Sequence, residues 1–565
     1  MHSRTHESIA DRSKGESLIA RLENFEMRYA GQMGRIGRYS IHFHMIGSVK
    51  KSYCRAVSIH HTYNRAIAIH GVHYLRVQNN IAFETLGHTY FVEDGVETKN
   101  VITGNLGANT RELFVGLTSD ATPATYWLVN GDNYVERNIA AGSTHCVLLA
   151  LDPWTSGLSS CPLPPILAIP QVRALSLAFA DGFWFFPEPK IRGASEFDPG
   201  CESICPQGVP LHHFADNEGH NNGRYGLRIF TGKSPHNGEG MAGFYPKEVD
   251  SCAVVSANNQ FKTARFVRQY SWRNGKNGIT VGSVAAINLV DPIVADNNMR
   301  GIELTGADGV IVGLGTETKL RGPWGMNRIM GALFVGHDLP CPDCDPSWAP
   351  NFPVKDAPLG WPTKVRLGLV QAASSGMTVD NATFINYDRT GMVAVAGFAK
   401  ALPPHGAGYD FKNAGAQETR FSNITWLQSN YRVRWRWDDE ALFTDLDGTF
   451  CEQPFCVGCH VLQNNRRSPQ LKPFFRLPHP REARVHAHVV KADTDHLFAW
   501  RAPQLSAINS PSPTASKIHD MAAQFVSRIT TSCKQASCLQ IRFCSGVGNP
   551  TSACARARVL LAIVC

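Results

Sequence analysis

Long apolar runs and an apolar leader are both missing from this chain of 565 residues. No stretch approaches the roughly 20 apolar residues that a membrane-spanning helix needs. The best candidate, residues 161–186, is interrupted by four prolines and by Arg173 and Asp181. The first residues, 1–7, lack the apolar core of a secretory signal. We therefore expect no signal peptide and no transmembrane helix in this chain, and membrane contact only through segments outside it.

Charge is also scarce, at 18% of the residues against 43% hydrophobic ones, which excludes a disordered polyelectrolyte. The formal net charge of +8 is a mild excess over this length, and Lys and Arg form no block. This balance is compatible with an acidic polymer as partner and predicts that nucleic acid is not bound. The 16 cysteines are scattered, so the chain is not a small disulfide scaffold.

Glycine and proline are plentiful instead, and 49 Gly with 33 Pro favour short strands and turns over long helices. Related phrases recur, because residues 76–82 are echoed by residues 134–140, and residues 274–279 by residues 297–302. A repeat of roughly 20–25 residues with Asn or Gly at its corners is typical of a parallel β-helix, in which each coil buries its inward side chains against the next. The predicted fold class is all-β, a parallel β-helix or solenoid.

The same repeat predicts the domain boundaries. Residues 31–143 are expected to form the first part of the β-helix and residues 181–460 its continuation, after an N-terminal remnant at residues 1–30. Residues 144–180 are rich in Leu, Pro and Ser and are predicted to be an irregular insertion, with a genuine surface loop as the alternative. Residues 461–565 lack the repeat and are expected to be a poorly ordered C-terminal tail.

Histidines gather in the first part of the predicted β-helix. Alternate residues of a strand share a face, so His42 and His44 point together, away from the apolar Ile41, Phe43 and Met45. Two outward histidines can hold a metal when neighbouring coils supply further ligands.

Further histidines follow at about the period of one coil: His60 or His61, then His70, then His88 with Asp94. We predict a divalent metal site for zinc, manganese or calcium. The predicted ligands are His42, His44, His61, His88 and Asp94. The alternative is a row of stacked histidines that simply hydrogen-bond their neighbours.

Glycosidic cleavage usually needs two carboxyl groups, and Glu93, Asp94 and Glu97 are the acidic group beside the histidines. Strand alternation places Asp94 on the face of His88 and Glu93 on the opposite face. The predicted catalytic residues are Asp94 and Glu93 together with His61 and His88, since a histidine titrates near neutrality. A plain Asp-Gly turn is the alternative for Asp94.

Arginine and tyrosine accompany these motifs. Arginine pairs bidentately with carboxylates such as those of uronic acids, and a tyrosine ring can stack on a sugar. We predict that Arg38, Arg65 and Tyr90 bind substrate. Solvated surface arginines, and aromatic stacking between coils, are the alternatives.

Two weaker motifs lie further along the chain. Residues 445–449 begin like a calcium loop but lack the Glu that closes an EF-hand, so either calcium binding or a plain turn is expected. Asn381 and Asn423 match the pattern of glycosylation acceptors, which is typical of an extracellular glycoprotein.

The histidine motifs also occur in a recognisable order: residues 38–47, 58–65, 68–71 and 87–95, with residues 125–127, 182–185 and 445–449 after them. This series resembles the family of the cell-migration-inducing hyaluronidase, transmembrane protein 2 and the fibrocystin-like proteins, over about residues 31–455. The resemblance implies a right-handed parallel β-helix on an extracellular or cell-surface protein. Compared with that family, we expect this chain to lack the glycine-rich domain that precedes the helix.

Two functions follow from the resemblance. One is a hyaluronidase-like glycoside hydrolase that depolymerises an acidic polysaccharide such as hyaluronan, or another uronic-acid polymer, laid along the helix. The other is a non-catalytic, fibrocystin-like segment of a cell-surface adhesion protein or receptor. The histidine series is implied for both branches, so the sequence does not decide whether the protein is an enzyme.

Overall fold

The computed structural model describes most of the chain up to residue 305 and shorter segments beyond it. The described residues are 18–113, 118–143, 180–229, 243–248, 251–252, 261–282, 284, 286–305, 327–337, 366–370, 377–389, 392–397, 418–430, 432–435, 441–452, 459–463, 474–476, 538–543 and 555–560. Within these ranges, no helix has the length and apolar character needed to cross a membrane.

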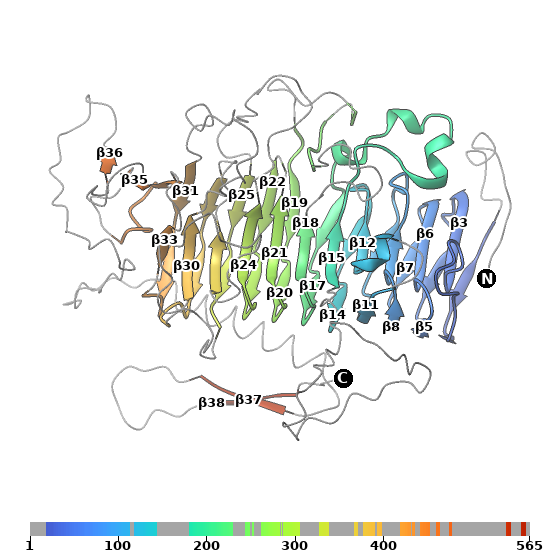
Figure 1. The fold of residues 1–565 in the computed structure, drawn as a ribbon, viewed down its shortest axis with the longest axis horizontal. Helices are drawn as coiled ribbons and strands as arrows, with labels where there is room; N and C mark the ends of the chain where they lie inside the picture. The colour runs from blue at the N-terminus through green and yellow to red at the C-terminus, as the bar shows by residue number, and fades with distance from the viewer. Residues whose placement is uncertain are drawn as a thin grey trace, which may run out of the picture. The chain divides into compact units, whose positions relative to one another are not determined.

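Three parallel sheets form a β-helix, as the repeats predict, and each coil from β1 to β33 adds one strand to every sheet (Figure 1). Sheet A contains β1 (Arg21–Glu23), β4 (Tyr53–Arg55), β7 (Arg76–Gln78), β10 (Val101–Thr103), β13 (Tyr134–Glu136), β16 (His213–Ala215), β19 (Ala264–Val267), β22 (Ile287–Val290), β25 (Asn327–Met330), β28 (Met377–Asp380), β31 (Glu418–Ser422), β34 (Ala441–Asp445), β35 (Cys459–Gln463) and β36 (Phe474–Arg476). Sheet B contains β2 (Glu26–Arg28), β5 (Ser58–Thr62), β8 (Ile81–Leu86), β11 (Leu106–Arg111), β14 (Ile139–Ala141), β17 (Glu218–His220), β20 (Tyr270–Trp272), β23 (Ile293–Ala295), β26 (Leu333–Val335), β29 (Thr383–Ile385) and β32 (Thr425–Leu427). Sheet C contains β3 (Ile41–Ser48), β6 (Ile67–His73), β9 (Tyr90–Val92), β12 (Ala124–Leu128), β15 (Asp181–Phe185), β18 (Tyr225–Ile229), β21 (Asn277–Gly282), β24 (Arg300–Thr305), β27 (Arg366–Val370), β30 (Met392–Gly397) and β33 (Val433–Trp435).

The stack begins earlier than the boundary expected at residue 31, because β1 and β2 already pair with β4 and β5. Before the expected insertion the last described strand ends at Ala141, and after it the next begins at Asp181; β12 pairs directly with β15 and β14 with β17. The coils are therefore continuous across the expected insertion, whose residues 144–179 lie outside the described part of the chain.

Most of the expected tail, residues 461–565, also lies outside the described residues, but strands occur within it. β35 and β36 add antiparallel strands to the end of sheet A. A second compact unit comprises residues 148–172 and 501–565, and it contains an antiparallel hairpin of β37 (Cys538–Phe543) and β38 (Ala555–Leu560).

Buried asparagines explain why the short Asn phrases recur. Asn80, Asn105, Asn138 and Asn217 stand in line at the turns from sheet A to sheet B, each at most 1% exposed. Each of the first three donates from its side-chain Nδ2 to the Oδ1 of the next asparagine. Because each of these amides is paired with a neighbouring coil and with the backbone, this asparagine ladder ties successive coils together.

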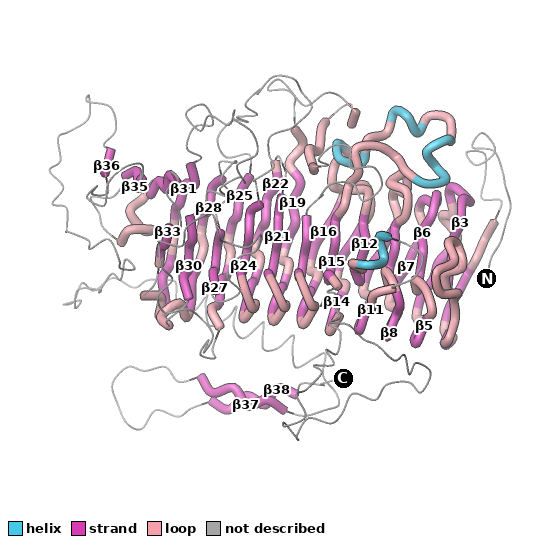
Figure 2. Tube along the Cα trace, viewed as in Figure 1, coloured by secondary structure: helices cyan, strands magenta, loops and turns pink. Residues whose placement is uncertain are grey.

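In the part of the chain that the structure describes, four short 3-10 helices interrupt the loops: η1 (Thr118–Ala121), η2 (Gly193–Phe197), η3 (Cys201–Ser203) and η4 (Pro206–Gly208). Three of them lie in one segment, residues 187–209, which we call the strap (Figure 2). A disulfide between Cys205 and Cys252 anchors the strap to a segment 47 residues later in the chain. The strap contacts the loop after β9, because the backbone N–H groups of Arg192 and Ser195 both donate to Asp94.

Candidate functional site

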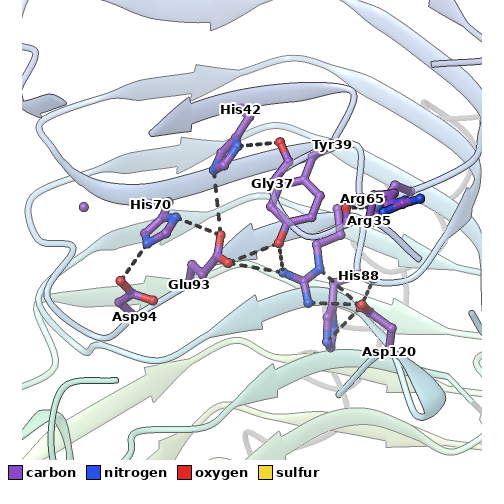
Figure 3. A network of polar contacts seen from close by, with 12 residues as sticks. Arg35, Gly37, Tyr39, His42, Arg65, His70, His88, Glu93, Asp94 and Asp120 are labelled. Carbon is purple, nitrogen blue, oxygen red and sulfur yellow. Dashed lines mark hydrogen bonds and ion pairs between the residues drawn. The ribbon is translucent and has the colours of Figure 1, made fainter. Parts of the chain in front are cut away.

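Histidines from two neighbouring strands meet on the outer face of sheet C (Figure 3). His42 and His44 alternate along β3, and His44 is in register with His70 on β6. One ring nitrogen of each histidine lies within 4.8 Å of those of the other two. The expected alternation holds at this point, since Ile41 and Phe43 are buried in the interior of the coil.

The alternation ends at Met45, which was expected to face inward with Ile41 and Phe43. Its backbone is left-handed, with φ of 52°, and the register between β3 and β6 shifts between His44 and Gly47. The Met45 Sδ atom lies 3.6 Å from Ser195 Oγ of the strap. Met45 therefore packs beneath the strap, next to the histidines.

Two carboxylates bracket the His70 ring. His70 Nε2 lies 2.7 Å from Asp94 Oδ2, and His70 Nδ1 lies 3.4 Å from Glu93 Oε2. Glu93 Oε2 is also 3.9 Å from His42 Nε2. The prediction that Glu93 and Asp94 face opposite ways is wrong, because β9 ends at Val92 and strand alternation ends with it.

The carboxylates determine the charge of this cluster. Burial favours a neutral His70 ring, but Glu93 and Asp94 outweigh it and raise the pKa of His70 to about 9. Burial also raises the pKa of Glu93, although His70 and Arg65 favour its ionised form. Behind them, Glu97 accepts hydrogen bonds from three backbone N–H groups, and burial raises its pKa to about 7.

Arg65 holds Glu93 from the side opposite to His70. Its guanidinium forms a two-pronged ion pair with Asp120, at 3.1 and 3.2 Å, and donates to Tyr39 Oη at 2.9 Å. Tyr39 Oη in turn donates to Glu93 Oε1 at 3.2 Å, while Arg65 Nη1 lies 3.6 Å from the same oxygen. The prediction that Arg65 contacts substrate is corrected, because the residue is only 3% exposed and packs on the Phe91 ring.

The structure does not bring His61 and His88 to the predicted site. His61 lies on β5 in sheet B, where its Nε2 is 3.1 Å from Glu84 Oε2. His88 is fully buried, accepts a hydrogen bond from the backbone of Ala124 and packs against Trp127. Spacing by one coil was the reason for grouping these residues, but a coil has three faces and the spacing does not say which one a residue occupies.

The other two predicted substrate-binding residues differ in exposure. Tyr90 is buried inside the coil, where its ring stacks on that of Tyr126 at 4.7 Å and its hydroxyl donates to Leu106 O. It is a core residue, as the alternative of aromatic stacking between coils anticipated. Arg38 is exposed in the loop before β3 and remains accessible to a ligand.

The donor set can be compared with the needs of a metal ion. Three imidazole nitrogens, with the Glu93 carboxylate beside them, suit zinc or manganese better than calcium, which prefers oxygen ligands. Asp94 hydrogen-bonds to Nε2 of His70, the ring nitrogen that faces away from Glu93. In metal sites, a carboxylate commonly orients a ligating histidine by bonding to its second ring nitrogen in this way. His70, which replaces His61 and His88 in this cluster, is predictable from one signal: residues 67–70 repeat the pattern of residues 41–44 one coil later.

The calcium-like motif at residues 445–449 has a different arrangement. Both Asp445 oxygens accept backbone N–H groups, from Gly448 at 2.9 Å and Cys451 at 2.8 Å. Asp447 accepts from the backbone of Asn423 at 2.7 Å. These contacts are those of a turn that closes onto the preceding coil, in line with the plain-turn alternative.

Comparison with known proteins gives a family model and a set of distant relatives. Residues 13–166 match the family model described as CEMIP beta-helix. Fibrocystin-L of Mus musculus is 27% identical over 445 residues, which are 77% of this chain and 8% of that protein. Cell surface hyaluronidase CEMIP2 of Homo sapiens is 33% identical over 153 residues, 22% of this chain and 11% of that protein. The mouse cell migration-inducing and hyaluronan-binding protein is 28% identical over 246 residues, 38% of this chain and 15% of that protein.

The chain thus spans only a small part of each of these relatives.

Among solved structures, one match is the catalytic domain of a GH87 alpha-1,3-glucanase. The match covers 77% of this chain and 65% of the glucanase chain, with 12% sequence identity and a TM-score of 0.33. A likeness at that level says nothing about activity. The sequence matches are the stronger finding, and they fall on the family that the sequence resembles. The chain is a distant homologue of fibrocystin-L and the CEMIP proteins, and its residues 13–166 match the CEMIP beta-helix family model.

Proposed function

We propose that this chain is an extracellular polysaccharide-active protein that depolymerises a uronic-acid polymer such as hyaluronan in the manner of a glycoside hydrolase. The observation that carries the proposal is the cluster on sheet C: three histidine nitrogens within 4.8 Å of one another, with Glu93 and Asp94 on either side of His70. Ordinary stacked histidines do not need two carboxylates on one ring.

In this proposal His42, His44 and His70 would hold a divalent ion, zinc or manganese, and the Glu93 carboxylate lies beside them. The ion would polarise a sugar oxygen or acidify a water molecule. Asp94 fixes the orientation of the His70 ring, and Ser195 of the strap fixes Asp94 through its backbone N–H. His44 and Glu93 are only partly buried, so they form the edge that a polymer can reach.

Glu93 is the residue we assign to proton transfer. Burial raises its pKa, which favours a protonated carboxyl group that can act as a general acid, and its side chain retains 15% exposure. Arg65 and Tyr39 hold the Oε1 atom, which leaves Oε2 directed at the histidines. Asp94 is nearly fully buried, so we assign it a positioning role in place of the predicted catalytic one.

The polymer and the location rest on the relatives and on the chain itself. Two relatives are named as a cell surface hyaluronidase and a hyaluronan-binding protein. The disulfide between Cys205 and Cys252 is of the kind that persists in oxidising compartments. The acceptor patterns at Asn381 and Asn423 are compatible with the same location.

A non-catalytic adhesion or receptor segment is the second candidate. It is favoured by coverage, since the similarity to fibrocystin-L extends over 77% of this chain whereas that to CEMIP2 extends over 22%. In this case the histidine cluster would serve to hold the first coils together.

Size-exclusion chromatography of hyaluronan, pectin and alginate after incubation with the purified chain distinguishes the two candidates. The enzyme proposal predicts shortening of at least one polymer with zinc or manganese, and loss of that activity in His44→Ala and Glu93→Gln. His212→Ala is the matched control, because the His212 side chain is 47% exposed and lies outside the cluster. If no polymer shortens with zinc, manganese, calcium or no metal, the enzyme proposal is wrong and the adhesion segment remains.

A further inference from the structure

An exposed aromatic and basic surface borders the histidine cluster. Residues 29–40 connect β2 of sheet B to β3 of sheet C, and we call them the basic loop because they include Arg35 and Arg38 and no carboxylate side chain. The Gly37 carbonyl of this loop accepts a hydrogen bond from His42 Nδ1 at 3.1 Å (Figure 3). The basic loop is therefore in direct contact with the candidate site.

Asn64 of the next coil holds the basic loop in place. It is fully buried, and its Nδ2 donates to Gln32 O at 2.9 Å and to Arg35 O at 3.1 Å. Gly31 packs directly on Asn64, since a Cβ at residue 31 would lie 2.9 Å from Asn64 Cβ. Within the loop, the backbone N–H groups of Arg35 and Arg38 donate to Gln32 O and Arg35 O. A loop fixed at these points presents its side chains in set positions, so a ligand has little ordering entropy to overcome.

The exposed side chains of this surface are aromatic and apolar. Tyr29 begins the basic loop and is 58% exposed, and Tyr63, which follows β5 in the next coil, is 44% exposed. The centroids of their rings lie 6.4 Å apart and the ring planes differ by 29°, so the two rings form one surface. Met33 and Ile36 of the same loop are exposed as well. Such a surface fits a partner that has a flat apolar face.

The fixed charges around the basic loop have one sign. Residues 27–83 contain eight Lys and Arg residues and no Asp or Glu. Arg55 pairs with Glu23 of an earlier strand, but neither Arg35 nor Arg38 forms an ion pair with a carboxylate in the part of the chain that the structure describes, and both are exposed. A partner that covers the loop therefore needs negative charge, because guanidinium groups buried without a counter-charge are costly.

We propose that the basic loop and Tyr63 form a polysaccharide subsite, in which a sugar ring stacks on Tyr29 and Tyr63 and uronic-acid carboxylates pair with Arg35 and Arg38. This inference rests on the proposed function, because it assigns contacts of the same acidic polymer outside the histidine cluster. A tyrosine ring offers an apolar face to the C–H groups of a sugar while its hydroxyl stays in water. Arginine offers a carboxylate two parallel N–H donors.

The course of the backbone suits a polymer that contacts both the subsite and the histidines. Arg38 lies four residues before His42 on β3, and Tyr63 lies seven residues before His70 on β6. Four residues of extended chain span roughly 13 Å. A hexasaccharide that lies over the basic loop can therefore reach the edge of the histidine cluster.

Isothermal titration with a hyaluronan hexasaccharide tests the subsite. The titration uses the full chain carrying His44→Ala, so that the probe is not cut. We expect Tyr63→Ser and Tyr29→Asn each to weaken binding about fivefold, the loss of one ring contact, and Tyr63→Phe to retain the affinity of the parent. Asparagine is chosen at residue 29 because φ there is 55° and asparagine adopts the left-handed conformation readily.

Charge is tested in the same titration. Arg38→Gln should weaken binding about fivefold at an ionic strength of about 0.02 M and less at about 0.5 M, because salt screens exposed charges. The carboxyl-reduced hexasaccharide should bind more weakly than the acidic one by a similar factor.

The matched controls carry the same kinds of substitution outside the subsite. Tyr74→Asn replaces another tyrosine with a left-handed backbone, φ 62°, which is 40% exposed in the turn between β6 and β7. Arg265→Gln replaces an exposed arginine on β19 in sheet A. Both controls should leave the affinity unchanged.

The outcomes separate this inference from the proposed function. Binding that depends on Tyr63 and Arg38 supports the subsite even if no polymer is ever cleaved. Affinities of Tyr63→Ser and Arg38→Gln within twofold of the parent would overturn the subsite, and so would equal binding of the carboxyl-reduced probe. Unchanged hexasaccharide binding together with a changed oligomeric state in Tyr63→Ser would identify a protein-contact surface and would also overturn it. If Tyr29→Asn lowers the melting temperature, the comparison of Tyr63→Ser with Tyr63→Phe decides the test.

Discussion

Replacing Asn105 with alanine should break the asparagine ladder in its interior, between Asn80 and Asn138. The Asn105 Oδ1 atom accepts from the backbone and the side chain of Asn80, at 3.0 and 2.9 Å. Its Nδ2 donates to Val77 O at 2.9 Å and to Asn138 Oδ1 at 3.0 Å. The substitution therefore removes four hydrogen bonds in a site that is 1% exposed, where water cannot replace them.

The cost follows from that count. A buried hydrogen bond contributes about 1 kcal/mol net, so the loss of four predicts a destabilisation of about 4 kcal/mol. Because a solenoid is stabilised coil by coil, the damage should be greatest in the coils that contain β7 and β10. Asn298→Ala is the control, since Asn298 is exposed and its side chain makes a single 3.2 Å bond to Gly275 O.

Urea unfolding followed by far-UV circular dichroism measures the total effect, and hydrogen–deuterium exchange read by mass spectrometry locates it. We expect a clearly lower urea midpoint for Asn105→Ala, faster exchange in residues 76–86 and 101–111, and a nearly unchanged Asn298→Ala. A loss below about 1 kcal/mol, or equal effects of the two substitutions, would refute the view that the ladder ties the coils together.

Three further predictions concern the surroundings of the site. Asp120→Asn should lower the rate of polymer cleavage at least tenfold and shift the pH profile of that rate, because Arg65 loses the ion pair that positions it against Glu93. An unchanged pH profile would refute this prediction. Gly193→Ala should weaken the attachment of the strap, because φ at residue 193 is 65° and a Cβ there would collide with the Asp94 carboxylate. Limited proteolysis should then cut faster within residues 187–209, and an unchanged rate of proteolysis there would contradict the prediction. The raised pKa of Glu97 means that the folded state keeps a proton that the unfolded state loses, so the stability contributed by Glu97 is present below pH 4.5 and is lost as the pH rises to about 7. Urea unfolding at pH 4.5 and at pH 8 should therefore give free energies of unfolding that differ by about 3 kcal/mol in the parent, and this difference should be absent in Glu97→Gln. Equal pH dependence in both proteins would contradict the prediction.

The sequence was sufficient for the fold because each coil carries its own signals. The asparagines of the repeated phrases, such as Asn80 and Asn138, occupy the ladder, and each follows a residue in the left-handed region, Asn79 or Arg137. Alternation along β3 was likewise enough to place His42 and His44 on one face. These features are local, and a short stretch of sequence contains all of them.

The rest of the site depends on contacts between distant parts of the chain. Arg65 is buried because Asp120, 55 residues later, pairs with it, and Asp94 is covered by Ser195, 101 residues later. The grouping of His61 and His88 with His42 failed because loop lengths set which face of the coil each residue occupies. A repeat pattern gives the coil period, whereas the position within the coil is decided by where each strand begins and ends.

Metal content is the most direct test of the central claim that His42, His44 and His70 form a metal-binding site. The purified chain is dialysed with zinc and then manganese, passed over a desalting column and measured by inductively coupled plasma mass spectrometry, alongside His42→Ala/His44→Ala and His212→Ala. The account predicts about one zinc or manganese ion per chain for the parent and for His212→Ala, and a loss of that ion in the double variant. Absence of bound metal in the parent, or equal metal in the double variant, would contradict it.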